Sequence, residues 1–168
     1  MFYENQPVDQ QQNYKKMLEI IGNLTLLFSE SDCPYLPYRC HENIFCKYFE
    51  AANLGRMDCS ADAKKNGIGI GLKTWMGSDD QKVAEFGRLR PEYEDLSGIE
   101  LVRQIAIYRN ERIRVTKNIH GIDQMIYHIV KRVPGAMKIM EHAFDYIDID
   151  NIQPVSYTHL TLPTTPYV

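Results

Sequence analysis

Residues 58–75 read DCSADAKKNGIGIGLKTW, a pattern that predicts a β-hairpin. Two short, apolar-leaning runs flank Lys-Lys-Asn-Gly at 64–67, and Asn-Gly is a strong signal for a tight two-residue turn. The second run has almost no polar face, so we expect its strand to lie near the centre of a sheet. Its alternating glycines, at 67, 69 and 71, indicate that another group approaches their face closely or that a helix packs tightly against it.

The segments on either side of this hairpin predict helices and further strands. Helical spacing of apolar residues and two capping-box patterns predict helices over 13–29, 42–54, 78–89 and 97–120, the last one capped by Gly121. Alternating patterns around a Pro-Gly turn predict strands over 125–133 and 136–142, with another near 146–149. Residues 1–10 are expected to form a loose arm and residues 29–40 a loop. This order predicts an α/β fold, with a central mixed β-sheet flanked by helices.

The composition is that of an ordinary folded domain. The chain has 168 residues, of which 44% are hydrophobic and 24% charged, enough to bury one core. No apolar run approaches the roughly 18 residues of a membrane span. The polar start MFYENQPVDQQQNYKK lacks the basic and apolar regions of a signal peptide. We therefore expect a cytoplasmic protein with no membrane partner.

The last residues, VSYTHLTLPTTPYV at 155–168, differ in character from the rest of the chain. They have two prolines, no charged residue and no periodicity, and they resemble translated sequencing-adaptor sequence. We expect one domain over residues 1–154, interrupted before its natural C-terminus, followed by a non-native tail at 155–168.

The cysteines do not predict a metal site. Four of them, at positions 33, 40, 46 and 59, have spacings that match no CxxC zinc knuckle. Without secretion, disulfides are not expected either. We predict free or buried thiols, with zinc binding as the lesser alternative.

The distribution of charge matters more than its sum. A net charge of −3 gives no global case for nucleic-acid binding, but basic residues are concentrated between positions 103 and 132. A local basic strip can bind phosphate whatever the net charge, and its alternative is a solvated helix face. The strip contains Arg103, Arg109, Arg112, Arg114, Lys117, Lys131 and Arg132.

The hairpin carries acids and a lysine of the kinds that metal-dependent phosphodiester cleavage requires. Asp58 and Asp62 are four residues apart and would share one face of a regular strand, with Lys73 near the end of the paired strand. Carboxylate oxygens hold hard cations such as Mg²⁺, and a positive group nearby can act on the attacking water and the phosphate. We expect the Asp62 carboxylate and the Lys73 ammonium to lie within about 6 Å of each other on one sheet face.

The segment from Asp58 to Trp75 resembles the core of the PD-(D/E)xK nucleases, and more narrowly type II restriction endonucleases with a GIGLKT-type strand. The similarity extends over about residues 38–133, through ENIFC at 42–46, NLGR at 53–56 and KVAEF at 82–86. It implies a restriction-endonuclease-like core, a metal-binding acid at Asp62, a catalytic lysine at Lys73, Mg²⁺ as cofactor and duplex DNA as substrate. Asp58 is a further catalytic candidate.

The sequence departs from the family motif at one position. The motif places Asp or Glu two residues before the lysine, where this chain has Gly71. Some nucleases of the superfamily carry that acid on the following helix, so Glu85 is the expected substitute, within about 8 Å of Asp62 if the two share a cation. Glu42 and Glu50, from the helix before the hairpin, are the alternative metal ligands.

The resemblance also implies partners. Arg109, Arg112, Arg114 and Lys117 would contact the DNA backbone, which positions a duplex without reading its bases. A homodimer and a companion DNA methyltransferase are further candidate partners.

Two other classes of function remain open. In the first, the chain is a non-catalytic DNA-binding or structural subunit, and Asp62 and Lys73 form a buried salt bridge. In the second and weaker one, it is a metal-independent hydrolase that uses Cys46 or Cys59 with His41. His128 has no chemical neighbour in the sequence, so we expect a structural role for it.

Overall fold

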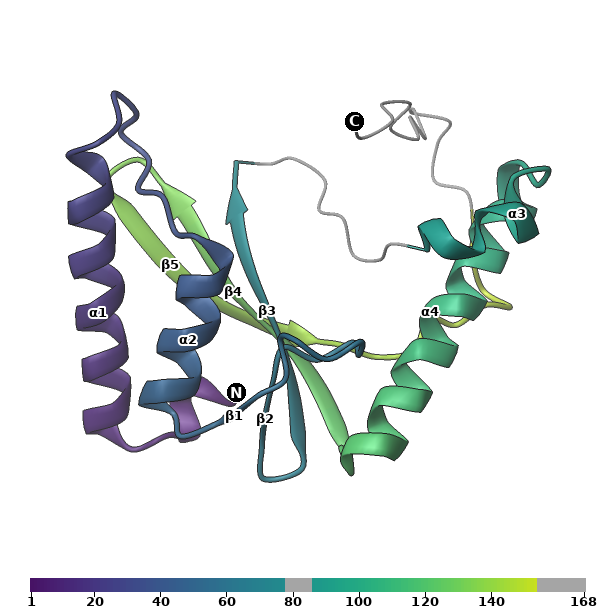
Figure 1. The fold of residues 1–168 in the computed structure, drawn as a ribbon, viewed down its shortest axis with the longest axis horizontal. Coiled ribbons are helices and arrows are strands. Elements are labelled where there is room, and N and C mark those ends of the chain that lie inside the picture. The colour runs from purple at the N-terminus through teal and green to yellow at the C-terminus, as the bar shows by residue number, and fades with distance from the viewer. Residues whose placement is uncertain (78–85, 154–168) are drawn as a thin grey trace.

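In the computed structural model, which describes residues 1–77 and 86–153, a mixed sheet of five strands runs through the centre of the molecule (Figure 1). The strand order is β1-β2-β3-β4-β5; β3 and β4 are parallel and the other neighbours antiparallel. Because helices flank this mixed sheet, the predicted α/β class is confirmed. The strands are β1 (Ala52–Asn53), β2 (Ala63–Lys65), β3 (Ile68–Met76), β4 (Gln124–Val133) and β5 (Ala136–Ala143).

The hairpin forms at the predicted place. Asn66 and Gly67 connect β2 to β3 with φ values of 50° and 75°, which is the backbone of a tight turn with two left-handed residues. β3 is the middle strand of the sheet, as its apolar sequence predicted.

The first strand of the hairpin is shorter than predicted, and the expectation that Asp58 and Asp62 share a strand face was wrong. β2 begins only at Ala63, and Asp62 makes the last ladder contact, donating its N–H to Ile70 O at 2.9 Å. Upstream of Asp62 the chain turns instead of pairing. The Ser60 N–H is bound by Thr116 Oγ1 at 2.9 Å, so a side chain outside the sheet satisfies this backbone group.

The first two helices begin earlier in the chain than predicted. The helices are α1 (Val8–Leu26), α2 (Tyr38–Tyr48), α3 (Arg90–Tyr93) and α4 (Gly98–His120), with short 3-10 segments η1 (Tyr3–Asn5) and η2 (Gly87–Leu89). Both α1 and α2 directly follow a proline, Pro7 and Pro37, whose fixed φ suits a helix start and which has no N–H to leave unpaired. α2 ends before the predicted residue 54 because Ala52–Asn53 pair with β2 as β1.

The N-terminal residues are not a loose arm, as the sequence had suggested, but part of the core. Phe2 and Tyr3 are 7% and 8% exposed. The Phe2 ring stacks on Phe45 at 5.6 Å between centroids, and Tyr3 meets Phe49 edge-on. An apolar N-terminal pair was mistaken for a tail because two residues give no periodicity to read.

The main core lies between one sheet face and the pair α1–α2, on the left of Figure 1. Its largest side chains are aromatic, with Tyr14, Phe45 and Phe49 all fully buried. They pack on Ile70, Leu72 and Val130 from β3 and β4. α2, which leads into the hairpin, is therefore fixed against the strand that carries Lys73.

α4 lies on the other side of the sheet and diverges from it toward its N-terminal end (Figure 1). Its C-terminal half reaches the sheet, where Ile113 packs with Ile122, Met125 and Phe144. Gly121 caps it with a left-handed φ of 56°, as predicted. Ser97 occupies the N-cap position, but its side chain makes no capping hydrogen bond, so the predicted capping box does not form.

Two other predicted elements have different outcomes. The helix predicted over 78–89 falls mostly outside the described residues, as does the tail at 155–168. The strand predicted near 146–149 was wrong, since residues 144–153 contain no strand. Asn110 of α4 bonds both the N–H and the C=O of Ile147 at 2.8 Å, and so takes the place of a neighbouring strand.

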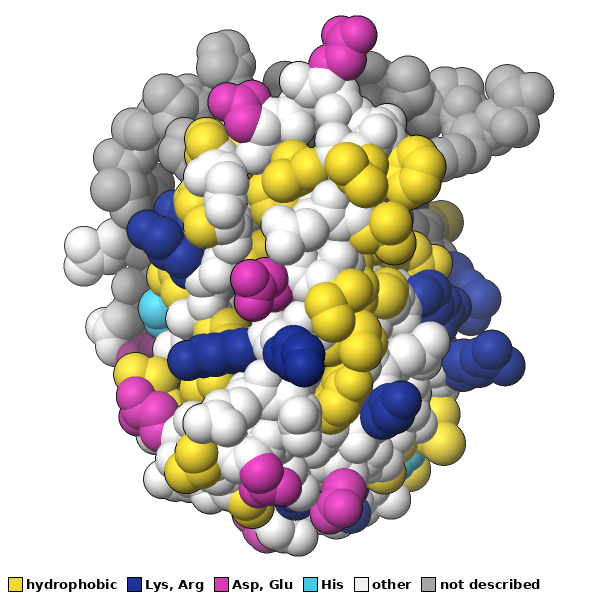
Figure 2. Space-filling view, turned by 90° about the vertical axis from the view of Figure 1, so that its left-hand side faces the viewer, with side chains coloured by type: hydrophobic (Ala, Val, Ile, Leu, Met, Phe, Trp, Pro, Cys, Tyr) yellow, Lys and Arg dark blue, Asp and Glu magenta, His cyan; other side chains and the backbone are white. Residues whose placement is uncertain are grey.

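Apolar side chains gather on the outer surface of α1 and the loop after it (Figure 2). Leu27 and Phe28 are 79% and 81% exposed, and Leu24 is 51% exposed. Among the described helices, none combines the length and the apolar character needed to cross a membrane.

Gly71 gives a direct test of the packing on the second sheet face. A Cβ at this position would lie 3.0 Å from Tyr127 Cδ1 and 3.2 Å from Phe144 Cε1, in a ring pair stacked at 4.0 Å. We expect Gly71→Ala to lower the free energy of unfolding by about 1–3 kcal/mol through overpacking. Urea denaturation would measure it, with Gly87→Ala as control, since a Cβ there meets no described atom within 4 Å. Equal stability of the two variants would contradict this packing.

Candidate active site

Asp62 and Lys73 meet where β2 separates from β3. The Asp62 Oδ2 atom accepts the Leu72 N–H at 2.7 Å, so the carboxylate continues the hydrogen-bond ladder one step beyond the strand. Lys73 Nζ lies 3.4 Å from the same oxygen. The two side chains are 25% and 39% exposed, so both remain open to solvent. The predicted proximity of this pair is confirmed.

Glu42, on α2, brings a second carboxylate to the loop that precedes β2, within electrostatic range of Asp62 and Lys73. Its residue is 7% exposed, and its Oε2 atom lies so close to Gly55 that a Cβ there would be 2.7 Å away. Burial raises the pKa of Glu42, and the nearby Asp62 charge raises it further, while Arg39 and Lys73 act in the opposite direction. A nearby cation would stabilise the Glu42 carboxylate, whose charged form is disfavoured by burial and by Asp62.

Arg39 is a neighbour of this site that the sequence analysis did not single out. Its Nη1 atom lies 3.4 Å from Glu42 Oε2 and 3.3 Å from Gly55 O. The signal was present, because Arg39 and Glu42 are three residues apart on one helix and such pairs face each other. Arg39 thus holds the Glu42 carboxylate against the loop that precedes β2.

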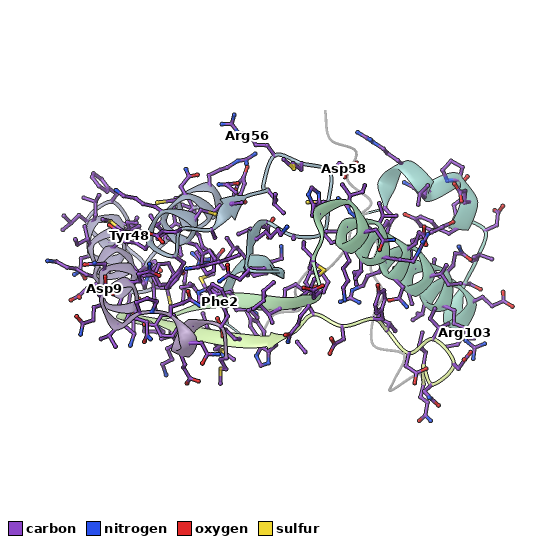
Figure 3. All side chains as sticks on the ribbon, turned by 90° about the horizontal axis from the view of Figure 1, so that it is seen from below. Phe2, Asp9, Tyr48, Arg56, Asp58 and Arg103 are labelled. Atoms are coloured by element: carbon purple, nitrogen blue, oxygen red, sulfur yellow. The ribbon has the colours of Figure 1, made fainter. Side chains whose placement is uncertain are left out.

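The other predicted acids do not join this pair among the described residues. Asp58 lies beside α4 (Figure 3), where its carboxylate accepts from Arg112 at 2.8 Å and its side chain is 81% exposed. Glu50 lies beyond the end of α2, is exposed, and has a left-handed φ of 51°. Glu85 lies outside the described residues. Within residues 1–77 and 86–153, no group of three or more His, Cys, Asp or Glu side chains could hold a metal ion.

The four basic residues predicted to bind DNA from α4 each have a partner within the chain. These contacts neutralise part of the strip or direct its charge toward the protein's own rings and carbonyls. The partners are Asp145 O and the Phe144 ring for Arg109, Asp58 for Arg112, Glu111 for Arg114 and the Tyr146 ring for Lys117.

The cysteines are free thiols, as predicted. Burial raises the pKa of Cys46 to about 11 and also raises the pKa of Cys59, so neither is a thiolate at neutral pH. His41 is 1% exposed, and its Nε2 atom is hydrogen-bonded to the Tyr14 hydroxyl at 3.0 Å. This arrangement does not favour a thiol nucleophile with His41 as its base.

A buried hydrogen-bonded chain, which we call the relay, joins four side chains from four elements. Tyr14 Oη lies 3.0 Å from Nε2 of His41 and 3.0 Å from Nε2 of His128. His128 Nδ1 in turn lies 2.8 Å from Glu141 Oε1, which also accepts the Tyr3 N–H at 3.1 Å. The relay therefore connects α1, α2, β4 and β5. It includes His41, the neighbour of Glu42 on α2.

Burial determines the protonation states of Tyr14 and His41 in the relay. Burial raises the pKa of Tyr14 far above its usual range and lowers the pKa of His41 to about 3, so Tyr14 is a neutral hydroxyl and His41 a neutral imidazole. A hydroxyl has one proton, so Tyr14 donates to one imidazole and accepts an N–H from the other. Every member is thus paired, as buried polar groups require.

Part of the relay could have been found in the sequence. A two-residue turn at Pro134-Gly135 sets the register of β4 and β5, and that register places His128 directly opposite Glu141. Tyr14 and His41 gave no such signal, because they are 114 and 87 residues away from His128 and meet it only through the packing of the helices. The expected structural role of His128 agrees with its complete burial.

No protein-family model, curated protein or solved structure matches this chain. Its function therefore has to be inferred from the geometry of the site.

Removing the Tyr14 hydroxyl tests the relay. Tyr14→Phe leaves two buried imidazole nitrogens without a partner, so we expect the free energy of unfolding to fall by about 1–3 kcal/mol. Tyr108→Phe is the matched control, because the Tyr108 hydroxyl bonds Glu92 at 2.9 Å on the surface; its denaturation midpoint should barely move. A Tyr14→Phe variant as stable as the control would show that the relay contributes nothing.

Proposed function

We propose that this protein is a Mg²⁺-dependent endonuclease that hydrolyses phosphodiester bonds of duplex DNA, with a restriction-endonuclease-like core. One observation carries the proposal: Asp62 and Lys73 lie 3.4 Å apart at the point where β2 and β3 separate, and Glu42 lies within electrostatic range of both. A metal-binding acid at Asp62 and a catalytic lysine at Lys73 are what the resemblance to PD-(D/E)xK nucleases implied. The resemblance to type II restriction enzymes supports the narrower assignment.

The carboxylates suit a hard cation. Mg²⁺ prefers oxygen ligands, keeps several waters, and is commonly bound through one or two carboxylates together with substrate phosphate. Asp62 and Glu42 would supply the two carboxylates, and Glu85 is the candidate for a third. When bound, the cation would polarise the phosphoryl oxygen and lower the pKa of a bound water.

Residues of the chain itself would orient the carboxylates and stabilise the charge that develops on the phosphate. The Asp62 carboxylate is held by the Leu72 N–H, so its orientation is set before any ligand arrives. Lys73, partly exposed, can donate hydrogen bonds to the attacking water or to the phosphate and stabilise the charge that develops there. Arg39 holds the Glu42 carboxylate against the loop that precedes β2.

Glu42 is a better supported partner of Asp62 than Asp58 or Glu50. Its carboxylate shares the electrostatic environment of Asp62 and Lys73, whereas Asp58 pairs with α4 and Glu50 lies exposed beyond α2. An acid at position 71 would collide with the Tyr127–Phe144 stack. Packing at Gly71 thus gives a physical reason why the second acid of the motif would lie elsewhere in this chain.

Plasmid cleavage with Mg²⁺, with and without chelator, tests the proposal. We expect Asp62→Asn and Lys73→Ala each to lower the cleavage rate by at least about 100-fold, because each removes a charge that acts on the reacting phosphate. Glu42→Gln and Glu85→Ala should also lose cleavage but keep most DNA binding. Asp58→Asn is the matched acid-to-amide control and should stay active.

The outcomes separate the alternatives. Full activity of Glu85→Ala would assign the second carboxylate to Glu42 alone. Unchanged cleavage after substitution of Glu42, Glu50 and Glu85 in turn would remove the carboxylate–metal mechanism. A wild-type chain that binds duplex but cleaves none with Mg²⁺ would instead be a non-catalytic subunit, with Asp62 and Lys73 as a structural ion pair.

A further inference from the structure

Three lysines, Lys73, Lys131 and Lys138, lie on the sheet face that points away from α1 and α2. Side chains alternate along a strand, so Lys73 and Trp75 lie on the face opposite the buried Leu72. The register pairs Trp75 with Lys131 on β4, and Lys131 with Lys138 on β5. Lys131 and Lys138, which we call the sheet lysines, therefore extend the Lys73 position across three strands.

The sheet lysines oppose each other without a compensating acid. Like charges directly opposite on neighbouring strands destabilise a sheet. Among the described residues, no acidic side chain forms an ion pair with either of them, and the Lys131 ammonium instead lies 5.3 Å from the centre of the Trp75 ring. A lysine on an edge strand also prevents edge-to-edge pairing, which accounts for Lys138 on β5. It does not account for Lys131 on the interior strand β4.

The basic residues of α4 differ from the sheet lysines in their contacts. Three cations of α4 bind Asp58, Glu111 or a backbone carbonyl, so a phosphate would have to displace those contacts. The fourth, Lys117, lies over a ring, as Lys131 does. Within the described part of the chain, the sheet lysines have no anion to give up. Phosphate binding at this face would also relieve the repulsion between them.

The sheet lysines are within reach of a substrate at the candidate site. Two residues along β3 and two strands across the sheet place the Lys138 Cα about 12 Å from that of Lys73, using ordinary strand dimensions. A duplex strand has one phosphate for about every 3.4 Å of helix axis. A duplex whose scissile phosphate lies at Lys73 would thus place flanking phosphates over β4 and β5.

We infer that Lys131 and Lys138 bind the phosphate backbone of duplex DNA beside the scissile phosphate, independently of sequence. The inference rests on the proposed function for its ligand, duplex DNA. It moves the main backbone contact from α4, where it was expected, to the face of β3–β5 that points away from α1 and α2. Each lysine acts through its charge alone, so it positions the duplex but reads no bases.

The salt dependence of DNA binding tests this inference without cleavage. The full chain would be titrated into a fluorescently labelled duplex in chelator, over a series of salt concentrations, for wild type and K131Q/K138Q. The slope of log affinity against log salt should fall by about 0.9 for each phosphate that the protein no longer neutralises, hence about 1.8 for the double variant. K138Q alone, at an exposed position, should lower the slope by about 0.9 and guards against misfolding of the double variant.

Two double variants with the same change of charge are matched controls. R109Q/R114Q removes cations from α4, and K15Q/K16Q removes exposed lysines from α1, on the opposite side of the sheet. Both should keep the wild-type slope.

Each outcome bears on the inference separately from the proposed activity. An unchanged slope in K131Q/K138Q, a larger decrease in R109Q/R114Q, or an equal decrease in K15Q/K16Q would overturn it, even if wild type cleaves DNA. A reduced slope in the sheet variants alone would support it, even if wild type does not cleave. Absence of any duplex binding by wild type would overturn it as well.

Discussion

The hydrogen bond from the Leu72 N–H to the Asp62 carboxylate is the contact on which the arrangement of the site depends. At this step a side-chain oxygen of Asp62 accepts the Leu72 N–H, in place of the backbone carbonyl that a longer β2 would have provided. The carboxylate therefore stays at the edge of β3 while the backbone turns away toward α4. Lys73, one residue beyond Leu72, then finds its counter-ion at 3.4 Å without any rearrangement. An aspartate directly before the first residue of a strand thus produces a fixed acid–lysine pair.

The core behind this edge explains why Glu42 can be close to a second acid. α2 is held by the Phe45 and Phe49 rings and by the relay through His41, so its position does not depend on the charge of Glu42. Burial of a carboxylate near another carboxylate is unfavourable unless a cation or a proton compensates it. Arg39 and Lys73 compensate in part. The remaining imbalance is the electrostatic reason to propose a divalent cation here.

Much of the fold followed from local sequence signals. The Asn-Gly turn, the Pro-Gly turn and the Gly121 cap each fix a backbone geometry within a few residues, and those elements formed where they were predicted. The pairing of Asp62 with Lys73 followed in turn from the hairpin. The errors arose where distant groups decide the local structure. Asn110 binds the backbone of Ile147 in place of a strand, and Thr116 binds the Ser60 N–H in place of β2. Nothing in the local pattern encodes either contact.

Direct binding of Mg²⁺ to the chain, measured by titration calorimetry without DNA, tests whether Asp62 and Glu42 share a cation. We expect measurable binding to wild type that disappears in both Asp62→Asn and Glu42→Gln. Binding should be retained in Asp58→Asn, whose carboxylate lies at α4 instead. Equal Mg²⁺ affinity in all four proteins would place the cation elsewhere, and Asp62 and Glu42 would then not share it.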